Sequence, residues 1–360
     1  MARSSRWLKG RVRTSLALSA FALLALLLVG ALAACGGDDG TSGDGATAPA
    51  ELRIAYQLIP NGDLIVKDQG WLEAALPDTE IKWVKFDSGS DVNTAMIAGS
   101  VDIGLAGSSP VAAGLSSPLN IPYTVPWIYD VIGIAESLVA SKDSGVTDVA
   151  GLVGKKVGTP FGSTAHYSLL AALEIAGVDP NKVKIIDLQP PDILAAWERG
   201  DIDAAYVWNP TLAELRANGT VLATSEELAG QGRLTADLAV VTTAFADKYP
   251  EAMQTWLDQQ TKAVTLYKTD PQAAGEAVGR QLNITADEAL AQMDELILLD
   301  ATEQAGADYL GTPDAPGKLT DNLLSASEFL KSQGQVEVVP GLDVFQAGLT
   351  NQFAAKAAGK

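Results

Sequence analysis

Three short segments rich in Gly, Ser and Thr have the composition to bind an anion. They are Phe86–Asp91, Gly107–Pro110 and Gly162–His166, and each stands between a strand-like run and a helix-like run. Free N–H groups at a helix start point outward, and the helix dipole favours negative charge there. Several such segments around one cleft would hold an oxyanion without any Arg. Ordinary helix capping is the alternative for each segment alone, with Ser109 capping a helix that begins at Pro110. The candidate ligand-binding residues in these segments are Asp87, Gly107, Ser108, Ser109, Ser163 and Thr164.

Further candidates carry the opposite charge or an aromatic face. Glu136 and Asp237 each begin a short apolar run, and either could pair with a ligand ammonium group. An ordinary solvated carboxylate is the alternative for each. Trp208 ends another strand-like run, where its ring could cover the ligand or contact a cation, although a core Trp would fit the same position. Tyr56, at the end of the first strand-like run, completes the set. These residues favour a small zwitterionic ligand.

The sequence offers little for catalysis or metal binding. It contains one His, His166, and one Cys, Cys35, which lie far apart in the chain, so neither a Cys/His pair nor a metal cluster is indicated. Ser163, Thr164 and Ser168 are too close to His166 in sequence to establish a catalytic triad. We therefore expect a binding protein without a cofactor, in which His166 packs or donates hydrogen bonds beside the third segment.

The N-terminus has the pattern of an export signal. Five basic residues lie between Arg3 and Arg13, an uncharged apolar run covers Leu16–Ala34, and Leu-Ala-Ala precedes Cys35. A Cys at this place resembles the lipobox of bacterial lipoproteins, whose Cys thiol receives a diacylglycerol. An uncleaved membrane anchor is the alternative, because the run is long enough to span a bilayer. We expect residues 1–34 to be a lipoprotein signal peptide and the protein to be extracytoplasmic, held to the membrane by lipid on Cys35.

The charge and composition of the chain after the signal indicate which binding partners to expect. Residues 36–50 contain no large apolar side chain, so residues 35–50 are predicted to form a flexible tether. Without the five basic residues of the signal, 20 Lys and Arg face 44 Asp and Glu, a net charge of −24. Such a surface repels nucleic acid and anionic lipid headgroups. We expect no nucleic-acid partner, a monomer, and membrane contact through the lipid.

From Glu51 onward, strand and helix signals alternate to about residue 240, which favours an α/β fold with parallel sheets and helices on their faces. Strands are predicted at 52–56 and 81–86. Helices are predicted at 67–76, 251–267, 271–282 and 286–298. The last of these helices has a capping box made by Thr285 and Glu288.

An internal repeat suggests two similar lobes. In residues 91–104 and 192–205, an Asp is followed by two helical turns, a Gly, and a second Asp that enters a strand. Gly99 and Gly200 suit the left-handed position that ends a helix. Chance reuse of a common junction is the alternative. We predict lobe 1 from residues 51–138 and 240–360 and lobe 2 from 139–239, with crossings at 136–140 and 237–241 and a ligand cleft between the lobes.

Several motifs carry a family resemblance. They are Lys85–Gly89, Gly107–Pro110, Ser163–Leu173, Leu188–Pro191, Ala195–Asp203 and Ala205–Trp208. With them the chain resembles the taurine-binding proteins of ABC importers, within the alkanesulfonate, nitrate and taurine solute-binding family. The resemblance implies a two-lobed, type II periplasmic-binding-protein fold with a hinge, no catalysis, and delivery of ligand to an ABC permease and its ATPase. It also implies that Ser108, Ser109, Ser163 and Thr164 surround the sulfonate, that Trp208 flanks the ligand, and that Asp237 binds the amine.

Three other interpretations are considered. The segment after Gln57, Leu58–Asp63, departs from the family pattern, so the ligand could be another alkanesulfonate or a betaine. An enzyme on the same fold, such as a thiamine-pyrimidine synthase relative, would need a reactive His and usually Cys-rich features, and the export signal also disfavours it. A structural or adhesive lipoprotein would give no reason for three segments suited to an anion.

Overall fold

The computed structural model describes residues 48–359. The predicted signal peptide, Cys35 and most of the predicted tether lie outside this range. Within it, no helix has the length and apolar character needed to cross a membrane.

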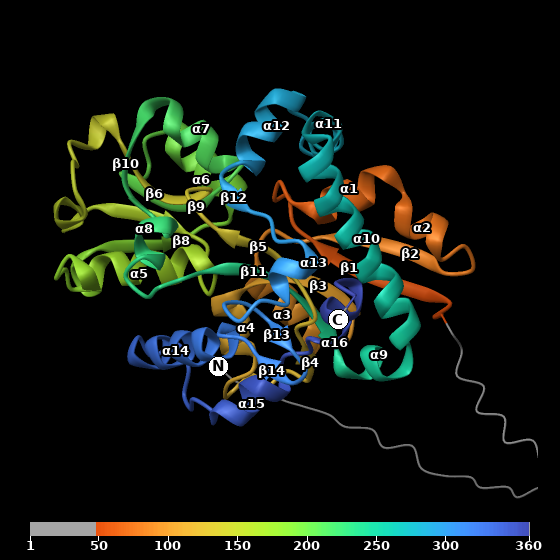
Figure 1. Ribbon diagram of the computed structural model, residues 1–360. Helices are drawn as coiled ribbons and strands as arrows, with labels where there is room; N and C mark the ends of the chain where they lie inside the picture. The colour runs from red at the N-terminus through yellow and green to blue at the C-terminus, as the bar shows by residue number, and fades with distance from the viewer. Residues whose placement is uncertain (1–47, 360) are drawn as a thin grey trace, which may run out of the picture. The chain divides into compact units, whose positions relative to one another are not determined.

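The larger of two main sheets combines parallel and antiparallel strands (Figure 1). Strands β1, β2 and β3 are parallel, whereas β11 runs antiparallel between β3 and β5. Short strands β12 and β4 pair with β5 and β11. The bounds are β1 Glu51–Tyr56, β2 Glu80–Lys85, β3 Ile103–Gly107, β4 Tyr123–Thr124, β5 Ile128–Ile132, β11 Ala236–Thr242 and β12 Leu296–Ile297.

The smaller sheet follows the same plan with the order β10-β6-β9-β7-β8. Its parallel strands are β7, β8 and β9, and β6 runs antiparallel to both β9 and β10. The bounds are β6 Glu136–Ser141, β7 Lys156–Thr159, β8 Lys184–Asp187, β9 Ala204–Trp208 and β10 Gly219–Thr224. All of these strands lie between Glu136 and Thr224, and the larger sheet draws strands from both sides of that span. A separate hairpin joins β13 Gly311–Thr312 and β14 Ala315–Pro316.

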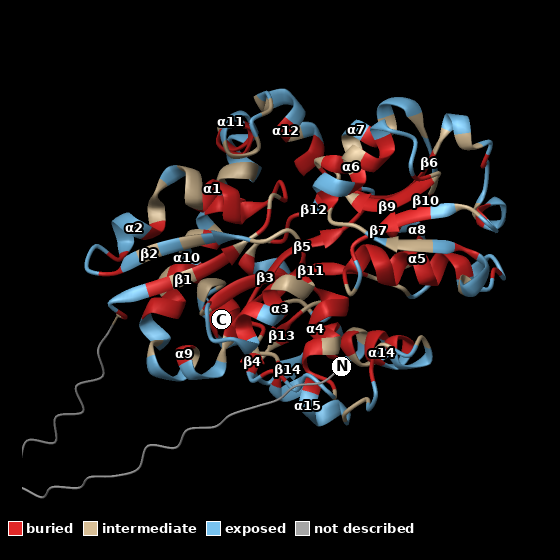
Figure 2. Ribbon diagram, turned by 180° about the vertical axis from the view of Figure 1, so that it is seen from behind, coloured by how far each residue is buried: buried red, intermediate tan, exposed pale blue. Residues whose placement is uncertain are grey.

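Helices connect the strands and cover the sheets. Those of the first half are α1 Gly62–Gln69, α2 Trp71–Ala75, α3 Gly89–Ile97, α4 Ser108–Gly114, α5 Thr164–Ile175, α6 Pro190–Glu198, α7 Thr211–Asn218 and α8 Ser225–Ala229. Those of the second half are α9 Thr243–Lys248, α10 Pro250–Thr269, α11 Pro271–Leu282, α12 Ala286–Met293, α13 Ala301–Gln304, α14 Leu319–Ser332, α15 Leu342–Ala347 and α16 Gln352–Ala357. Short 3-10 turns occupy Lys142–Ser144, Val149–Leu152 and Pro180–Lys182. The buried strands at the centre of both sheets are visible in Figure 2.

Most of the predicted elements are confirmed, with two differences. The helix predicted at 67–76 is wrong, because α1 begins at Gly62 and Gly70, with φ 61°, separates it from α2. The helix predicted at 286–298 ends at Met293, since Leu296 and Ile297 pair with β5 instead. The predicted capping box is present, with Thr285 and Glu288 each binding the other's backbone N–H.

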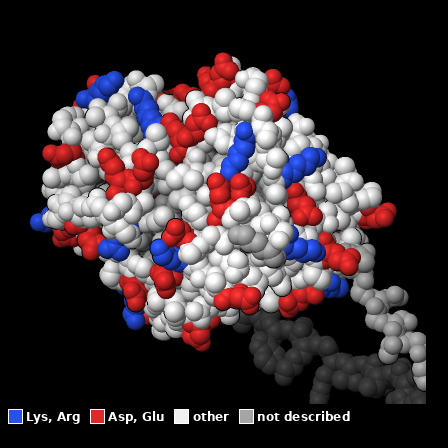
Figure 3. Space-filling model, viewed as in Figure 1, with Lys and Arg blue, Asp and Glu red and all other residues white. Residues whose placement is uncertain are grey.

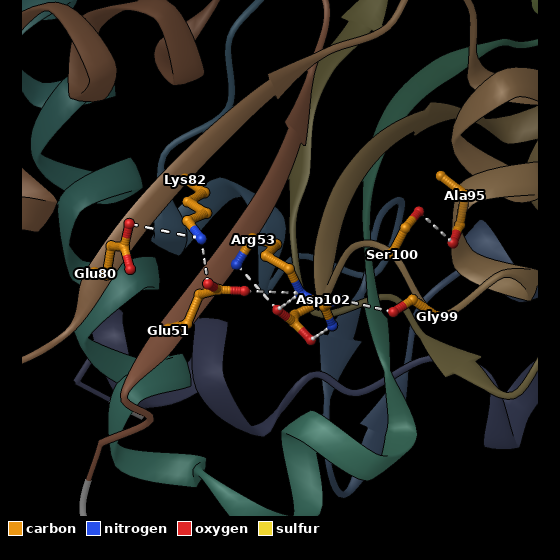
Figure 4. A network of polar contacts seen from close by, with 8 residues as sticks. All are labelled: Glu51, Arg53, Glu80, Lys82, Ala95, Gly99, Ser100 and Asp102. Carbon is orange, nitrogen blue, oxygen red and sulfur yellow. Dashed lines mark hydrogen bonds and ion pairs between the residues drawn. The ribbon is translucent and has the colours of Figure 1, made fainter.

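The sequence repeat corresponds to a structural repeat. Gly99 and Gly200 both follow a helix at positive φ, 65° and 70°. Asp102 accepts a hydrogen bond from the Arg53 backbone N–H at 2.9 Å, and Asp203 accepts one from the Lys156 N–H at 2.8 Å. Figure 4 shows the first copy, where Asp102 also binds the Arg53 guanidinium. The same strand–helix–strand junction therefore occurs once in each sheet.

The chain passes between the sheets just before the predicted crossings. Strand β6 lies wholly in the smaller sheet and β11 wholly in the larger one. The connecting residues are 133–135, between β5 and β6, and 230–235, between α8 and β11. The residue limits drawn from the sequence for the two lobes remain a prediction.

Candidate functional site

A cavity lies where residues of the two sheets meet. Its empty volume is about 420 Å³, including the part open to solvent. Six of the ten candidate ligand-binding residues line it, namely Gly107, Glu136, Ser163, Thr164, Trp208 and Asp237. The other lining residues are Gln57, Ile59, Pro60, Gly89, Pro110, Ile132, Ala135, Asn209 and Leu296. The cavity is mostly apolar with a few polar groups, as is usual for small-molecule sites.

The N-terminus of helix α5 forms one polar wall. Ser163 is its N-cap, and the Ser163 Oγ accepts from the His166 N–H at 3.2 Å and donates to the Pro160 carbonyl at 2.6 Å. The Thr164 Oγ1 donates to Glu136 Oε2 at 2.5 Å. Both hydroxyls are thus engaged within the protein. The first backbone N–H groups of α5, which have no acceptor inside the helix, are the donors left for a ligand.

The segment Gly107–Pro110 differs from its predicted geometry. Helix α4 begins at Ser108 with Gly107 as N-cap, so the prediction that Ser109 caps a helix starting at Pro110 is wrong. The Ser108 Oγ accepts from the Ala236 backbone N–H at 3.2 Å. The Ser109 Oγ is buried without a hydrogen-bond partner among the described residues. Neither Ser108 nor Ser109 is among the residues that line the cavity.

Two further candidates also lie outside the cavity. Asp87 is half-buried and pairs with the Lys85 ammonium at 3.1 Å. Tyr56 packs edge-on against Trp83, with ring centroids 6.1 Å apart. The structure therefore separates these two residues from the six that it brings together.

At Gly107, which lines the cavity, there is no room for a larger side chain. An added Cβ on Gly107 would meet the Thr164 Cγ2 at 2.4 Å. The Gly107 backbone has φ −65°, which any residue can adopt. Glycine is therefore required here by the close approach of β3 to the N-terminus of α5 and not by backbone conformation.

The carboxyl group of Asp237 faces the cavity with no hydrogen bond from any described residue. The side chain is 6% exposed. Burial, together with the neighbouring carboxyls of Asp130 and Glu136, raises its pKa well above the ordinary value. An acceptor buried this deeply without a donor marks a place where a ligand donor would be favourable.

Glu136 is fully buried, so the solvated alternative for this residue is wrong. Its carboxyl accepts from the Thr164 hydroxyl, from the Ser225 hydroxyl at 2.8 Å and from the Ser168 hydroxyl at 3.4 Å. Burial nevertheless raises the pKa of Glu136 to about 7. The protein itself thus satisfies this carboxyl.

Sequence reasoning missed several residues at the site. Asp130 lies in β5 directly opposite Asp237, and burial raises its pKa to about 7. A lone Asp within the apolar run 127–132 was the available signal. Gln57 donates to the Leu105 carbonyl at 3.0 Å, and Asn209 donates to Glu295 at 2.8 Å. Both line the cavity.

His166 packs beside the site, as the sequence suggested. Its ring stacks on Phe161 at 4.5 Å, and its Nδ1 accepts from the Gly162 N–H at 3.3 Å. Burial lowers the pKa of His166 to about 4. No group of three or more His, Cys, Asp and Glu residues in the described part of the chain is arranged to hold a metal ion.

Two α/β lobes with a cavity between their sheets define the type II periplasmic-binding-protein fold. The chain belongs to the NMT1/THI5-like family, whose model matches residues 62–274. It is 36% identical to the taurine-binding periplasmic protein of Escherichia coli (strain K12) over 263 residues, which cover 72% of this chain and 79% of the relative. The resemblance seen in the sequence motifs is therefore confirmed.

Solved structures share the fold. The alkanesulfonate-binding protein SsuA from Xanthomonas axonopodis pv. citri, bound to MOPS, superposes with a TM-score of 0.69 at 21% identity, covering 85% of this chain and 99% of that one. The desulfurization enzyme DSZB has a TM-score of 0.60 at 17% identity, covering 86% and 99%. At these identities the two structures establish the fold alone, which serves both a binding protein and an enzyme.

Proposed function

We propose that this chain is the extracytoplasmic substrate-binding lipoprotein of an ABC importer, and that it captures taurine in the cavity and delivers it to the permease and its ATPase. The observation that carries the proposal is the polarity of the cavity. One wall is the N-terminus of α5, and another carries the buried carboxyl of Asp237 with no donor of its own. Taurine has a sulfonate and an ammonium separated by two carbons, which matches these two walls.

Each part of the ligand has a partner. The sulfonate lies against the first N–H groups of α5, where the helix dipole favours an anion. The ammonium donates to Asp237 in a charge-assisted hydrogen bond. The Trp208 ring lies at the end of β9, where it covers the ligand or contacts its cation. The taurine-binding relative supports this assignment.

Another alkanesulfonate or a betaine is the second candidate. Part of the segment that departs from the family pattern, Ile59 and Pro60, lines the cavity and so affects the shape available to the ligand. Asp237 nevertheless favours taurine, because a quaternary ammonium has no N–H to donate and an amine-free sulfonate leaves the carboxyl without a partner.

Catalysis has little support from the site. His166 is stacked on Phe161 and is not among the cavity-lining residues, and burial keeps it neutral at physiological pH. The proposal is therefore binding without turnover, and a product formed from taurine or an alkanesulfonate by the purified protein would contradict it.

Isothermal titration of the full-length protein with taurine and with ethanesulfonate, its amine-free analogue, tests the ligand. We expect taurine to bind with submicromolar to micromolar affinity and ethanesulfonate to bind much more weakly. Heat with ethanesulfonate but none with taurine would contradict the taurine assignment. Native mass spectrometry of protein purified from cells provides an independent check, because a bound ligand would add its own mass.

Membrane attachment has a separate test. We expect Cys35 to carry a diacylglycerol and the protein to fractionate with the membrane, whereas Cys35→Ser should remove the lipid mass and release the protein. A Cys35→Ser protein that stays with the membrane after processing would contradict the lipid anchor.

A further inference from the structure

We propose that Asp130 acts with Asp237 as a carboxyl pair that shares a proton in the empty cavity and releases it when a ligand ammonium binds. Asp130 is then a specificity-determining residue for amine-bearing sulfonates. The inference rests on the proposed function, because it assumes that the cavity binds an amine.

Strand register places the two carboxyls together. Asp130 in β5 and Asp237 in β11 are directly opposite each other in an antiparallel pair. Opposite residues project from the same face of a sheet and lie close together. Asp237 lines the cavity, so Asp130 stands immediately behind the carboxyl that would meet the ligand.

Both carboxyls are incompletely satisfied. Asp130 is fully buried, and its Oδ2 accepts from the Asn61 amide at 3.0 Å. Its Oδ1 is buried without a partner among the described residues. Asp237 receives no hydrogen bond from the described residues. Two buried carboxyls side by side cannot both ionise readily, so one proton shared between them is the expected state.

The groups around the pair do not supply a cation. Glu136 approaches from β6, and Asp63 on α1 accepts from Gln260 at 2.8 Å while lying near Tyr129 of β5. On the opposite face of the sheet, Ala236 and Val131 line a second pocket with Tyr309, Asp308 and Lys318. The Asp308–Lys318 ion pair there is solvent-exposed. No Lys or Arg is among the described residues that line the ligand cavity.

Burial raises the pKa of Asp130 to about 7 and that of Asp237 well above its ordinary value. A ligand ammonium stabilises the ionised carboxyls, so the proton shared by the pair passes to solvent while the ammonium keeps all its N–H bonds. Taurine should then bind more tightly as pH rises from about 5 to about 8, by up to tenfold per pH unit for each proton released. A sulfonate without an amine favours the protonated pair, so its affinity should fall over the same range.

Titrations of the full-length chain with taurine and with ethanesulfonate, at several pH values and in buffers of different ionisation enthalpy, test the proposal. We expect proton release with taurine and opposite pH slopes for the two ligands. Taurine binding without proton release, or with an affinity independent of pH, overturns the inference and leaves the proposed function standing. Absence of taurine binding at every pH overturns both.

The variant Asp130→Asn keeps the shape of the side chain and removes its proton. We expect it to reduce the number of protons released, because only Asp237 is left to release one, to make the taurine pH slope shallower and to weaken taurine about tenfold at pH 8, with little change for ethanesulfonate. Asp308→Asn is the control, because Asp308 lines the pocket against the opposite face of these strands, and it should behave as wild type. An Asp130→Asn protein that releases as many protons with taurine as the wild type, with the same pH slope, overturns the role of Asp130. If the variant does not fold, the pH slopes of taurine and ethanesulfonate affinity in the wild-type protein still test the proposal.

Discussion

Each lobe places a buried carboxyl opposite the last residue of a parallel strand, but the surroundings of the two carboxyls differ. Asp237 lies opposite Gly107, the last residue of β3, and Glu136 lies opposite Trp208, the last residue of β9. Each carboxyl thus lies within the first two residues of an antiparallel strand, beside the end of the third parallel strand of its lobe. Three hydroxyls bind Glu136, whereas no described residue donates to Asp237. The comparison indicates that one carboxyl holds the smaller lobe together and that the other is left for a ligand.

The residues opposite the carboxyls differ as well. Gly107 leaves room for Thr164 of the other lobe to approach closely, and Trp208 provides an aromatic wall.

Figure 3 shows acidic side chains spread over one face of the molecule with Lys and Arg between them. The cavity differs from this surface, since its described lining residues include carboxyls and no Lys or Arg. The difference between the two carboxyls can be tested by altering each position in turn.

The largest effect is expected for Asp237→Asn. Losing the buried charge opposite the ligand amine should weaken taurine by about a hundredfold or more, because breaking one partner of a buried charge pair costs roughly 2–5 kcal/mol. Ethanesulfonate, which has no amine, should change much less. Isothermal titration with both ligands measures this ratio, and equal losses for the two would remove Asp237 from its role.

Gly107→Ala should have the next largest effect. The added Cβ would meet the Thr164 Cγ2 at 2.4 Å, so the end of β3 and the N-terminus of α5 could not approach as closely around the ligand. Overpacking of this kind costs roughly 1–3 kcal/mol, which corresponds to about a 5- to 150-fold loss in affinity for taurine and ethanesulfonate alike. Gly230→Ala, whose nearest neighbour would be the Glu227 carbonyl at an ordinary 3.4 Å, is the matched control. Unchanged affinity in Gly107→Ala would argue against this close approach in the bound state.

Glu136→Gln should alter taurine affinity by no more than about threefold, because the protein already satisfies this carboxyl and hydrogen bonds remain available to Gln. Its main effect should be on stability. Burial raises the pKa of Glu136 from 4.5 to about 7, so its contribution to stability is complete below pH 4.5 and is lost as pH rises through about 7.

The empty protein should therefore be less stable at pH 8 than at pH 5, and Glu136→Gln should reduce this dependence by about 1 kcal/mol per pH unit between the two pKa values. Denaturant unfolding at several pH values measures it. A Glu136→Gln protein that loses taurine affinity as severely as Asp237→Asn would show that the two carboxyls have the same role.

The smallest effect is expected for a contact between the lobes. Glu295, which precedes β12, accepts from the Arg216 guanidinium of α7 at 2.7 Å and from the Asn209 amide at 2.8 Å. Because this ion pair is partly exposed, Glu295→Gln should speed taurine release by only about twofold, or roughly 0.4 kcal/mol. Stopped-flow fluorescence follows release, with Asp308→Asn as the exposed ion-pair control. A Glu295→Gln protein with unchanged release would mean that this contact does not hold the lobes together.

The sequence predicted the features that depend on neighbouring residues. Gly99 and Gly200 end their helices as expected, since the need for positive φ is set within a few residues. Ser163 caps α5, which was the alternative interpretation of its segment. These local signals, with the alternation of strands and helices, were enough to indicate an α/β fold with a repeated unit.

Features that depend on contacts between distant segments of the chain could not be predicted from the sequence in the same way. The importance of Asp130 arises from its register with Asp237, which is set only when β5 and β11 pair. The hydroxyls of Ser108 and Thr164 were predicted to face the ligand, yet their partners are Ala236 and Glu136, far away in sequence. The location of the cavity could thus be predicted from the sequence. Which of its hydroxyls and carboxyls bind each other, and which are left for a ligand, could be seen only in the tertiary structure.

A crystal structure of the protein with taurine would test the central claim most directly. We expect the taurine nitrogen within about 3 Å of an Asp237 carboxyl oxygen, as is usual for a charge-assisted hydrogen bond, and the sulfonate at the first N–H groups of α5. A taurine bound the other way round, with its sulfonate toward Asp237, or an amine left in solvent, would contradict it.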